Sequence, residues 1–585
     1  MIAWLPLMIA IPLGVGFLLP LMEKFVRAPR AAEALAVVAS LACIALSVII
    51  LVVETPEPYW AGGWSIGSAA AVGISLVCDG MTRLVLLMTN LVAFAAILYS
   101  LSYMRQYTAR PYYFSLFFLM LAGMNGVILA GDMFNLFVFL EVAAIASYAL
   151  VAYGVEREEL EAAFKYAILG SLGSTLILFA IGITYNLTGV LNMRQMAEAL
   201  RAGGMNQALL VATAFFFAGF GMKAAMVPFH AWLPDAHPSA PAPISALLSG
   251  ILIKALGVYA FCRVFFTVLP IDASVAVVLM ALGVTSMVVG VFLAVGQWDF
   301  KRLLAYHSIS QMGYVVLALG LAAAMLARSQ TASADRSWAV AVAGLALFGG
   351  LFHLFNHAMF KSLLFLCSGA VEYATGSRQL KELGGLVNRM PVTSLCCRVG
   401  ALSISGVPPF NGFFSKLIII VALIQGGYYV LAAVTVAVSF LTLLSFVKVQ
   451  RYVLHGEPSA RAAAAREVPL PMSLAMIVLA VVCSGSGFLV PFYRGHLFDP
   501  AGQTLASAAI SNMRPIPLEE TPELSPAESY PFGDSLASVV GPESGAAPAS
   551  ESPGEIAAKV PTRQRLPQQR TVAVPAPPID MEDLP

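Results

Sequence analysis

Long apolar stretches separated by short polar segments run through most of the chain. A helix needs about 20 consecutive apolar residues to cross the hydrocarbon core of a bilayer. The pattern predicts an all-α integral membrane protein with about fourteen transmembrane helices. We expect them at roughly residues 2–22, 31–53, 74–103, 112–130, 133–153, 162–186, 207–228, 241–268, 273–295, 303–325, 339–371, 392–425, 427–450 and 470–492.

The composition agrees with this pattern. Of the 585 residues, 59% are hydrophobic and 11% are charged, whereas soluble domains carry about 25% charged residues. The first apolar stretch has no positively charged residue before it and no small-residue cleavage site. We therefore expect a retained span there, rather than a signal peptide that is removed.

Lysine and arginine are unevenly distributed between alternate loops, and cytoplasmic loops carry the excess in membrane proteins. With the N-terminus outside, the cytoplasmic loops would hold Lys24, Arg27, Arg30, Arg105, Arg110, Arg157, Lys301, Arg302, Arg378, Lys381, Arg389, Arg451, Arg461 and Arg466. The opposite loops would hold only Arg194, Arg201, Arg328 and Arg336. The pattern predicts a multi-pass protein of the plasma membrane with both termini on the non-cytoplasmic side.

The character of the chain changes near its end. Residues 500–585 are rich in Pro, Ser, Ala and Glu, a composition that cannot bury a core. We expect a disordered, mostly acidic tail. A small basic cluster within it, KVPTRQRLPQQR, is either solvated or a docking segment for a partner.

A few ionisable residues interrupt the predicted spans. A charged side chain at the centre of a membrane helix costs about 2.5–3.5 kcal/mol, so each one is a functional-site hypothesis. The candidates for a proton relay are Glu141, Lys223, Lys254, His353, His357, Lys361 and Lys416. Accessory candidates, nearer to span ends or in turns, are His307, His230, Asp235, His237 and Lys448.

The first candidates form an acid–lysine group. Glu141 lies halfway along its span, where a carboxylate stays ionised only beside a cation. Lys223 and Lys254 lie in adjacent spans, each flanked by glycines that permit close helix contact. Two neighbouring ammonium groups disfavour double protonation, so a proton tends to leave one of them. The group suits a proton relay; the alternative is a structural ion pair that fixes helix register.

His353, His357 and Lys361 recur every four residues, so they form one stripe on a helix. Histidine titrates near neutral pH, which suits stepwise proton transfer through bound water. A His-x-x-x-His pair can also bind zinc, but no third ligand has convincing spacing, and we expect no metal site.

The polar residues outside this group have two interpretations each. His307 either lines the same hydrated path or makes hydrogen bonds within the helix bundle. His230, Asp235 and His237 stand in a Pro-rich turn, where they either gate a proton pathway or are solvated. Asp79 and Arg83 are four residues apart, which predicts a structural ion pair.

Prolines interrupt two lysine-bearing spans. Pro228 follows Lys223, whereas Pro408 and Pro409 precede Lys416. Proline breaks helices, and unwound backbone at membrane depth is tolerated only in a protein interior or a water-filled cavity. Two such spans at corresponding places indicate a transporter built from two repeats. The predicted organisation is 1–111 (first helices), 112–268 (first repeat), 269–450 (second repeat), 451–499 (last helix) and 500–585 (tail).

Four segments between roughly residues 70 and 450 resemble the antiporter-like subunits of respiratory complex I, membrane-bound hydrogenases and Mrp-type cation/proton antiporters. They are KAAMVPFHAWLPDAHPSAPAPISALLSGILIK, DFKRLLAYHSISQMGY, HLFNHAMFKSLLFL and SGVPPFNGFFSK. The resemblance implies inverted repeats of five helices each, broken seventh and twelfth helices, and a polar axis along the membrane plane. It matches the relay candidates to the family's fifth-helix glutamate (Glu141), seventh-helix lysine (Lys223), eighth-helix lysine (Lys254), eleventh-helix set (His353, His357, Lys361) and twelfth-helix lysine (Lys416).

The resemblance implies a subunit that moves protons, or exchanges sodium for protons, in a multisubunit redox-driven complex. Its partners would be other membrane subunits, a peripheral redox module and lipid, and the net charge of +1 gives no indication of nucleic acid. The chain has no Cys-x-x-Cys, dinucleotide-binding or Walker-type motif, so we expect no bound cofactor. The alternatives are an Mrp-type antiporter subunit, a non-transporting scaffold, and a subunit of an inorganic-carbon uptake system.

Overall fold

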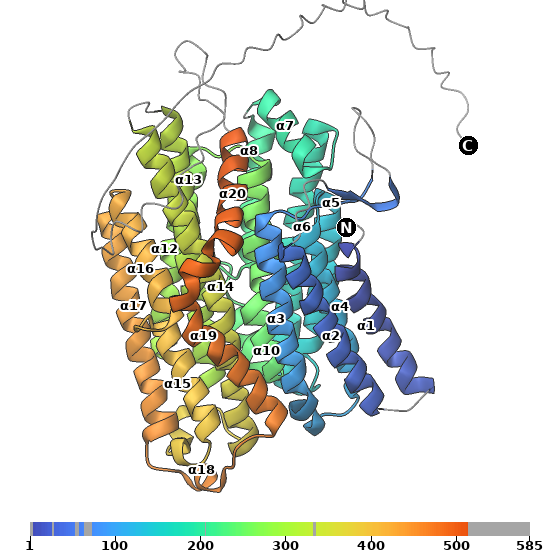
Figure 1. The fold of residues 1–585 in the computed structure, drawn as a ribbon, viewed down its shortest axis with the longest axis vertical. Coiled ribbons are helices and arrows are strands. Elements are labelled where there is room, and N and C mark those ends of the chain that lie inside the picture. Colours follow the sequence, from blue (N-terminus) through green and yellow to red (C-terminus); the bar gives the residue numbers. More distant parts are fainter. Residues whose placement is uncertain are drawn as a thin grey trace, which may run out of the picture. The chain divides into compact units, whose positions relative to one another are not determined.

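The computed structural model describes residues 4–25, 29–52, 58–63, 73–204, 206–331 and 335–512, and helices account for most of them (Figure 1). The longer helices are α1 (Leu7–Phe25), α2 (Pro29–Val52), α3 (Gly80–Tyr103), α4 (Arg110–Leu129), α5 (Met133–Val151), α6 (Arg157–Thr188), α8 (Gln207–Lys223), α12 (Ala273–Val295), α13 (Phe300–Thr331), α14 (Arg336–Thr375), α15 (Pro391–Ser405), α16 (Asn411–Gln425), α17 (Tyr429–Val449) and α19 (Leu470–Leu497).

The remaining elements are shorter. They comprise α7 (Met193–Gly203), α9 (Leu233–Ser239), α10 (Ala242–Leu247), α11 (Ala260–Cys262), α18 (Ala460–Ala464) and α20 (Asp499–Asn512). Three π-helical segments are η4 (Leu248–Tyr259), η5 (Arg263–Val268) and η8 (Gln450–His455). Strands β1 (Tyr59–Trp60) and β2 (Ser75–Leu76) pair antiparallel, with Tyr59 opposite Leu76.

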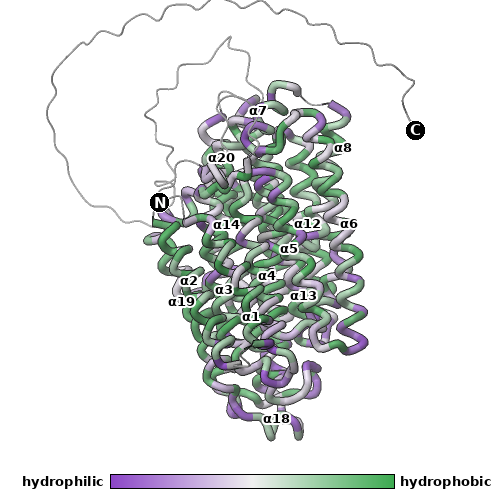
Figure 2. Tube along the Cα trace, turned by 90° about the vertical axis from the view of Figure 1, so that its right-hand side faces the viewer, coloured by the Kyte–Doolittle hydropathy of each residue, from purple (hydrophilic) through white to green (hydrophobic). Residues whose placement is uncertain are grey.

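The helices have the length and hydropathy of membrane spans. Within the described ranges, 12 of them are long and apolar enough to cross a bilayer, and α8 and α16 are shorter apolar helices. Hydrophobic residues extend along the helices in Figure 2, whereas hydrophilic residues gather near α7 at one end and α18 at the other. The prediction of an all-α integral membrane protein is confirmed.

The first predicted helix break lies directly after a relay candidate. Helix α8 ends at Lys223, and Ala225 adopts a left-handed conformation with φ of 52°. Pro228 lacks the N–H that would continue the helical hydrogen bonding. The chain therefore passes through turns before α9 begins at Leu233.

The second predicted break also combines a residue of left-handed conformation with proline, but here the prolines precede the lysine. Helix α15 ends at Ser405, and Gly406 forms a left-handed cap with φ of 75°. Such a cap favours glycine, which has no Cβ to clash with the backbone. Pro408 and Pro409 follow, and α16 starts at Asn411. Each break thus places a helix end close to a lysine-bearing segment.

The C-terminal boundary differs from the prediction. Residues 499–512 form α20, although the composition predicts a disordered tail from residue 500. Ala501, Leu505 and Ala509 recur every four residues and are fully buried, and α20 packs on α3, α14 and η5. This apolar stripe is local, so the average composition of the tail conceals it. The rest of the predicted tail, 513–585, lies outside the described residues.

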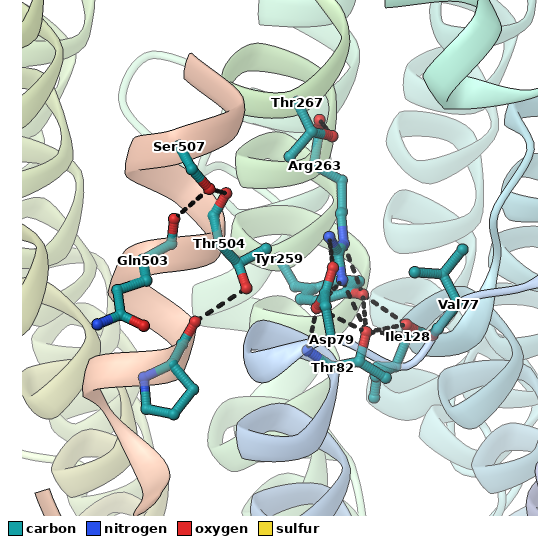
Figure 3. Close-up of polar contacts among 11 residues, drawn as sticks. Val77, Asp79, Thr82, Ile128, Tyr259, Arg263, Thr267, Gln503, Thr504 and Ser507 are labelled. Carbon is teal, nitrogen blue, oxygen red and sulfur yellow. Dashed lines mark hydrogen bonds and ion pairs between the residues drawn. The ribbon is translucent and has the colours of Figure 1, made fainter. Parts of the chain in front are cut away.

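Asp79 also departs from the prediction. Its partner is Arg263 of η5 and not Arg83, with Nη1···Oδ2 and Nη2···Oδ1 distances of 2.5 and 2.6 Å (Figure 3). Asp79 caps α3 by accepting from the backbone N–H of Thr82, which turns the carboxylate away from the next turn of its own helix. Burial alone would raise the pKa of Asp79, but the charge and hydrogen bonds of Arg263 outweigh burial and lower that pKa.

This pair is supported by further hydrogen bonds. Arg263 donates through Nε to the Tyr259 hydroxyl at 2.8 Å and through Nη2 to the Thr82 hydroxyl at 2.7 Å. Tyr259 in turn donates to the backbone carbonyl of Ile128 at 2.5 Å. Figure 3 shows α20 beside this cluster, which joins α3, α4 and η5 at one end of the bundle.

We expect Asp79→Asn to lower the free energy of unfolding by about 3 kcal/mol, because it leaves the buried Arg263 guanidinium without its charged partner. Thermal unfolding in detergent measures the effect. Arg83→Gln is the matched control, and it should change the midpoint much less. Equal losses in the two variants would contradict the observed pairing.

Candidate functional site

An acid–lysine pair lies at the break after α8. The Lys223 ammonium is 3.5 Å from Glu141 Oε1 on α5, and the two side chains are 4% and 26% exposed. Ser174 of α6 donates a hydrogen bond to the same carboxylate oxygen. Because Lys223 is the last residue of α8, its ammonium lies where regular helix gives way to turns. The structure therefore brings these two predicted residues into contact.

Lys254 lies in the neighbouring π-helical segment η4. It is fully buried, and its ammonium donates to the backbone carbonyl of Ser249. The two lysine-bearing segments approach closely at Gly257, where an added Cβ would lie 2.6 Å from the Ala224 Cα. Only a residue without a side chain fits there, as expected at a tight contact between membrane helices. In the part of the chain that the structure describes, Lys254 forms no ion pair.

The predicted stripe on α14 is buried along its whole length. His353 shares a hydrogen bond with the Ser415 hydroxyl of α16, with Nδ1 3.0 Å from Oγ. The Lys361 ammonium donates to the backbone carbonyl of Leu304 on α13. His357 lies between them, one helical turn from each.

Lys416 lies on α16, just after the second break. Its ammonium donates to the Ile404 carbonyl at 2.8 Å and to the Ser439 hydroxyl at 3.2 Å. It also lies 5.0 Å from the centre of the Tyr314 ring, a cation–π distance. Ile404 belongs to the last turn of α15, where a carbonyl has no partner within the helix. The broken helix thus supplies an acceptor for a buried cation.

These groups form a continuous band through the bundle. Helix α5 packs on α6, α6 on α8, α8 on η4, η4 on α14 and α14 on α16. At Gly250 an added Cβ would clash with the Ser362 hydroxyl, which shows how closely η4 and α14 approach beside Lys254 and Lys361. The helices that carry the relay candidates therefore pack on one another in series from α5 to α16.

Several buried polar atoms along this band have no hydrogen-bond partner among the described residues. They are both ring nitrogens of His237 and His357, Nε2 of His353, Nδ1 of His307, both amide atoms of Gln311, and Oδ1 of Asn411. Buried polar atoms are nearly always satisfied, by water where protein offers no partner. Water bound between the lysines would satisfy such atoms.

The accessory candidates fall into two groups. His307 is fully buried, and its Nε2 lies 2.8 Å from the Ser445 hydroxyl of α17, so it makes a hydrogen bond within the helix bundle. His237 is also fully buried, in α9, so the interpretation as a solvated turn residue is wrong for it. Asp235 instead forms ion pairs with Lys165 and Arg302 at 3.1 and 3.4 Å.

The other two accessory candidates are less enclosed. His230 is half-buried in the turn after α8, and its Nδ1 has no partner among the described residues. Lys448 donates to the carbonyls of Val295 and Gln297 at 2.7 and 2.6 Å. It therefore holds the end of α12 and lies apart from the histidine stripe.

The structure reveals one buried cation that sequence reasoning assigned to a loop. Lys301 at the start of α13 is 2% exposed and forms an ion pair with Glu372 of α14 at 2.9 Å. Both side chains line a polar cavity of about 400 Å³, together with Glu159, Arg378 and Arg461. The hydropathy of the sequence places Lys301 just outside a span. Its burial depends on packing against α14, which carries Glu372, and a local sequence pattern does not show that contact.

Comparison with known proteins identifies the family. The family described as NADH:quinone oxidoreductase/Mrp antiporter, TM matches residues 130–332 and 338–442, which include every relay candidate. The chain belongs to this family. The resemblance that the sequence motifs predicted is thereby confirmed.

Individual relatives extend over most of the chain. The D subunit of the Na(+)/H(+) antiporter of Alkalihalophilus pseudofirmus is 35% identical over 400 residues, which are 68% of this chain and 76% of that protein. The N subunit of the NADH-quinone oxidoreductase of Desulforudis audaxviator is 35% identical over 480 residues, 80% and 90% of the two chains. A chain of the Mrp complex from Dietzia sp. DQ12-45-1b is 26% identical, with a TM-score of 0.77 over 87% of this chain and 98% of that one.

Proposed function

We propose that this family member is the proton-translocating subunit of a multisubunit, redox-driven complex in the plasma membrane. The observation that carries the proposal is the band of four buried lysines interleaved with polar atoms that lack protein partners. A scaffold needs the charges only to fix helix register. That role does not need imidazole nitrogens that have no protein partner among the described residues.

The geometry suggests an order for the proton steps. Protons enter from the cytoplasm near Lys223 and Lys254, pass along His353, His357 and Lys361, and leave at Lys416. Glu141 sets the proton affinity of Lys223 through their separation, since a closer carboxylate favours the charged ammonium. Movement of this pair would couple proton release to events in a partner. Ser174, which shares the carboxylate, limits where Glu141 can move.

The lateral face of α5 supports a neighbouring membrane subunit. Phe134, Val138 and Ile145 are 49%, 39% and 62% exposed, and Glu141 lies at the helical spacing that continues their face. A carboxylate on an apolar lateral surface is costly against lipid alone. We therefore infer that another subunit covers this face. A peripheral redox module is a further partner that the proposal requires.

The second candidate function is an Mrp-type antiporter subunit that exchanges sodium for protons without a redox partner. The relationship to a subunit of a Na(+)/H(+) antiporter and to a chain of an Mrp complex favours it. Affinity purification in mild detergent, with mass spectrometry of the co-purifying chains, separates the two. Iron–sulfur or nickel-binding proteins would support the redox-driven complex, and only small hydrophobic subunits would support the antiporter.

We expect Glu141→Gln and Lys223→Met each to lower ion transport by about 100-fold, because each removes a group that holds or releases the proton. Transport is measured in proteoliposomes that contain the purified complex, with pH-sensitive and sodium-sensitive dyes. Subunit stoichiometry is measured on the same preparations, and it should stay unchanged.

Glu161→Gln is the matched control for these variants. Glu161 pairs with Lys165 at 2.8 Å, but its side chain is 60% exposed, so its loss should leave transport near normal. The scaffold interpretation predicts that Glu141→Gln and Lys223→Met impair assembly and do not impair transport itself. It would be supported by poor assembly combined with normal transport per assembled complex.

The proposed orientation can be tested with cysteine labelling. The cysteines in the described part of the chain are all buried, so they give little background with a membrane-impermeant maleimide. Gln379→Cys, at the polar cavity, should react from the cytoplasmic side, and Gln207→Cys, at the start of α8, from the opposite side. Labelling of right-side-out and inverted vesicles measures this. The reverse pattern would invert the proposed topology.

A further inference from the structure

A second cavity lies between α15 and α17. It has a volume of about 380 Å³, within the range of roughly 300–1,000 Å³ that small-molecule sites occupy. Its deeper part is lined by Ala401, Leu402, Leu443, Phe446 and Val447. We call this cavity the α15–α17 crevice. Neither the proton relay nor the polar cavity accounts for it.

One end of the α15–α17 crevice is positively charged. Arg451 and His455 of η8 line it, and Arg398 of α15 lies 3.0 Å from His455, measured from Nη2 to Nε2. A guanidinium group can only donate, so the imidazole is the acceptor of this bond. The Nε of Arg398 is buried and has no hydrogen-bond partner among the described residues. This end thus combines two permanent cations, of which Arg451 lines the crevice and Arg398 adjoins it through His455.

These cations have no acidic partner in the part of the chain that the structure describes. Neither Arg398 nor Arg451 forms an ion pair there, and no acidic side chain lines the α15–α17 crevice. By contrast, Lys301 and Arg378 both form ion pairs with Glu372. Two arginines without an acidic partner, one of them lining the crevice, therefore suit an anion from outside the chain.

The arrangement of charge and apolar surface follows the depth of a bilayer. Arg451 and His455 lie in the last turns of the span Tyr429–His455, at the level of the headgroups. Leu443 and Phe446 lie one to three turns deeper along the same helix. Leu444 and Val447 beside them are 47% and 52% exposed on the lateral surface, so the crevice is continuous with the space that acyl chains occupy.

We propose that the α15–α17 crevice binds one anionic phospholipid, with its phosphate on Arg398 and Arg451 and an acyl chain along Leu443 and Phe446. Basic pockets between transmembrane helices on the cytoplasmic side bind such headgroups in other membrane proteins. A free phosphate would leave the apolar part of the crevice unfilled. A zwitterionic lipid would bring no net negative charge to the two arginines.

The test is native mass spectrometry of the full-length chain in its complex, released from nanodiscs. The nanodiscs contain phosphatidylethanolamine with either phosphatidylglycerol or no anionic lipid. We expect an adduct with the mass of phosphatidylglycerol to be retained by the wild-type protein. Arg398→Gln and Arg451→Gln should each lower its occupancy about fivefold, the usual contribution of one cation near a membrane surface.

Two further variants separate the parts of the site. Arg389→Gln removes an exposed cation from the same end of the bundle but outside the crevice, and the adduct should persist. Val447→Trp fills the apolar part and leaves both arginines in place, so the adduct should be lost while the protein stays folded. Thermal unfolding midpoints check folding of every variant.

Three results would overturn the proposal. Phosphatidylethanolamine could be retained as well as phosphatidylglycerol in all variants, which would show that the arginines select nothing. Inorganic phosphate at millimolar concentration could displace the lipid completely, which would show a plain anion site. A photo-reactive amino acid at Val447 could cross-link in native membranes to protein instead of lipid, which would show that another protein covers the crevice.

Discussion

The cost of holding ammonium groups inside a membrane protein constrains this fold more than any other requirement. Of the buried lysines in the band, Lys223 has a carboxylate, whereas Lys254, Lys361 and Lys416 bind backbone carbonyls. Regular membrane helices use their carbonyls internally, so two of these lysines bind carbonyls where the helical pattern is interrupted, whereas Lys361 shares the Leu304 carbonyl within helix α13. The π-helical η4 and the last turn of α15 are two such places.

This constraint explains why the helix breaks and the lysines occur together. At the first break the lysine ends a helix, and at the second the helix that ends supplies a carbonyl to the lysine of the next one. A purely structural cation network would be stable once each ammonium had its acceptors. The imidazole nitrogens of His353 and His357 that lack a partner among the described residues suit the binding of water instead. That difference separates a relay from a scaffold.

Sequence reasoning predicted the features that depend on local composition. The apolar stretches, the breaks at Pro228 and Pro408 and the lysines of the band could all be identified from hydropathy and from the cost of buried charge. Features set by distant contacts could not. Asp79 lies beside Arg263 because the start of α3 meets η5. Helix α20 is held by a short stripe of buried apolar residues, and the polar composition of the surrounding tail hides this stripe in any average over the segment. The internal repeat and the boundaries of its halves stay predictions.

The proposed relay requires that the buried groups act in series, and Lys361 is a suitable test because it lies on α14, whereas the Glu141–Lys223 pair lies on α5 and α8. The measurement is proton flux through reconstituted complexes that carry Lys361→Met, at equal subunit stoichiometry to the wild type. If the buried groups act in series, proton flux is lost in Lys361→Met although both helix breaks remain intact. Flux equal to that of the wild type would show that protons do not pass along the α14 stripe.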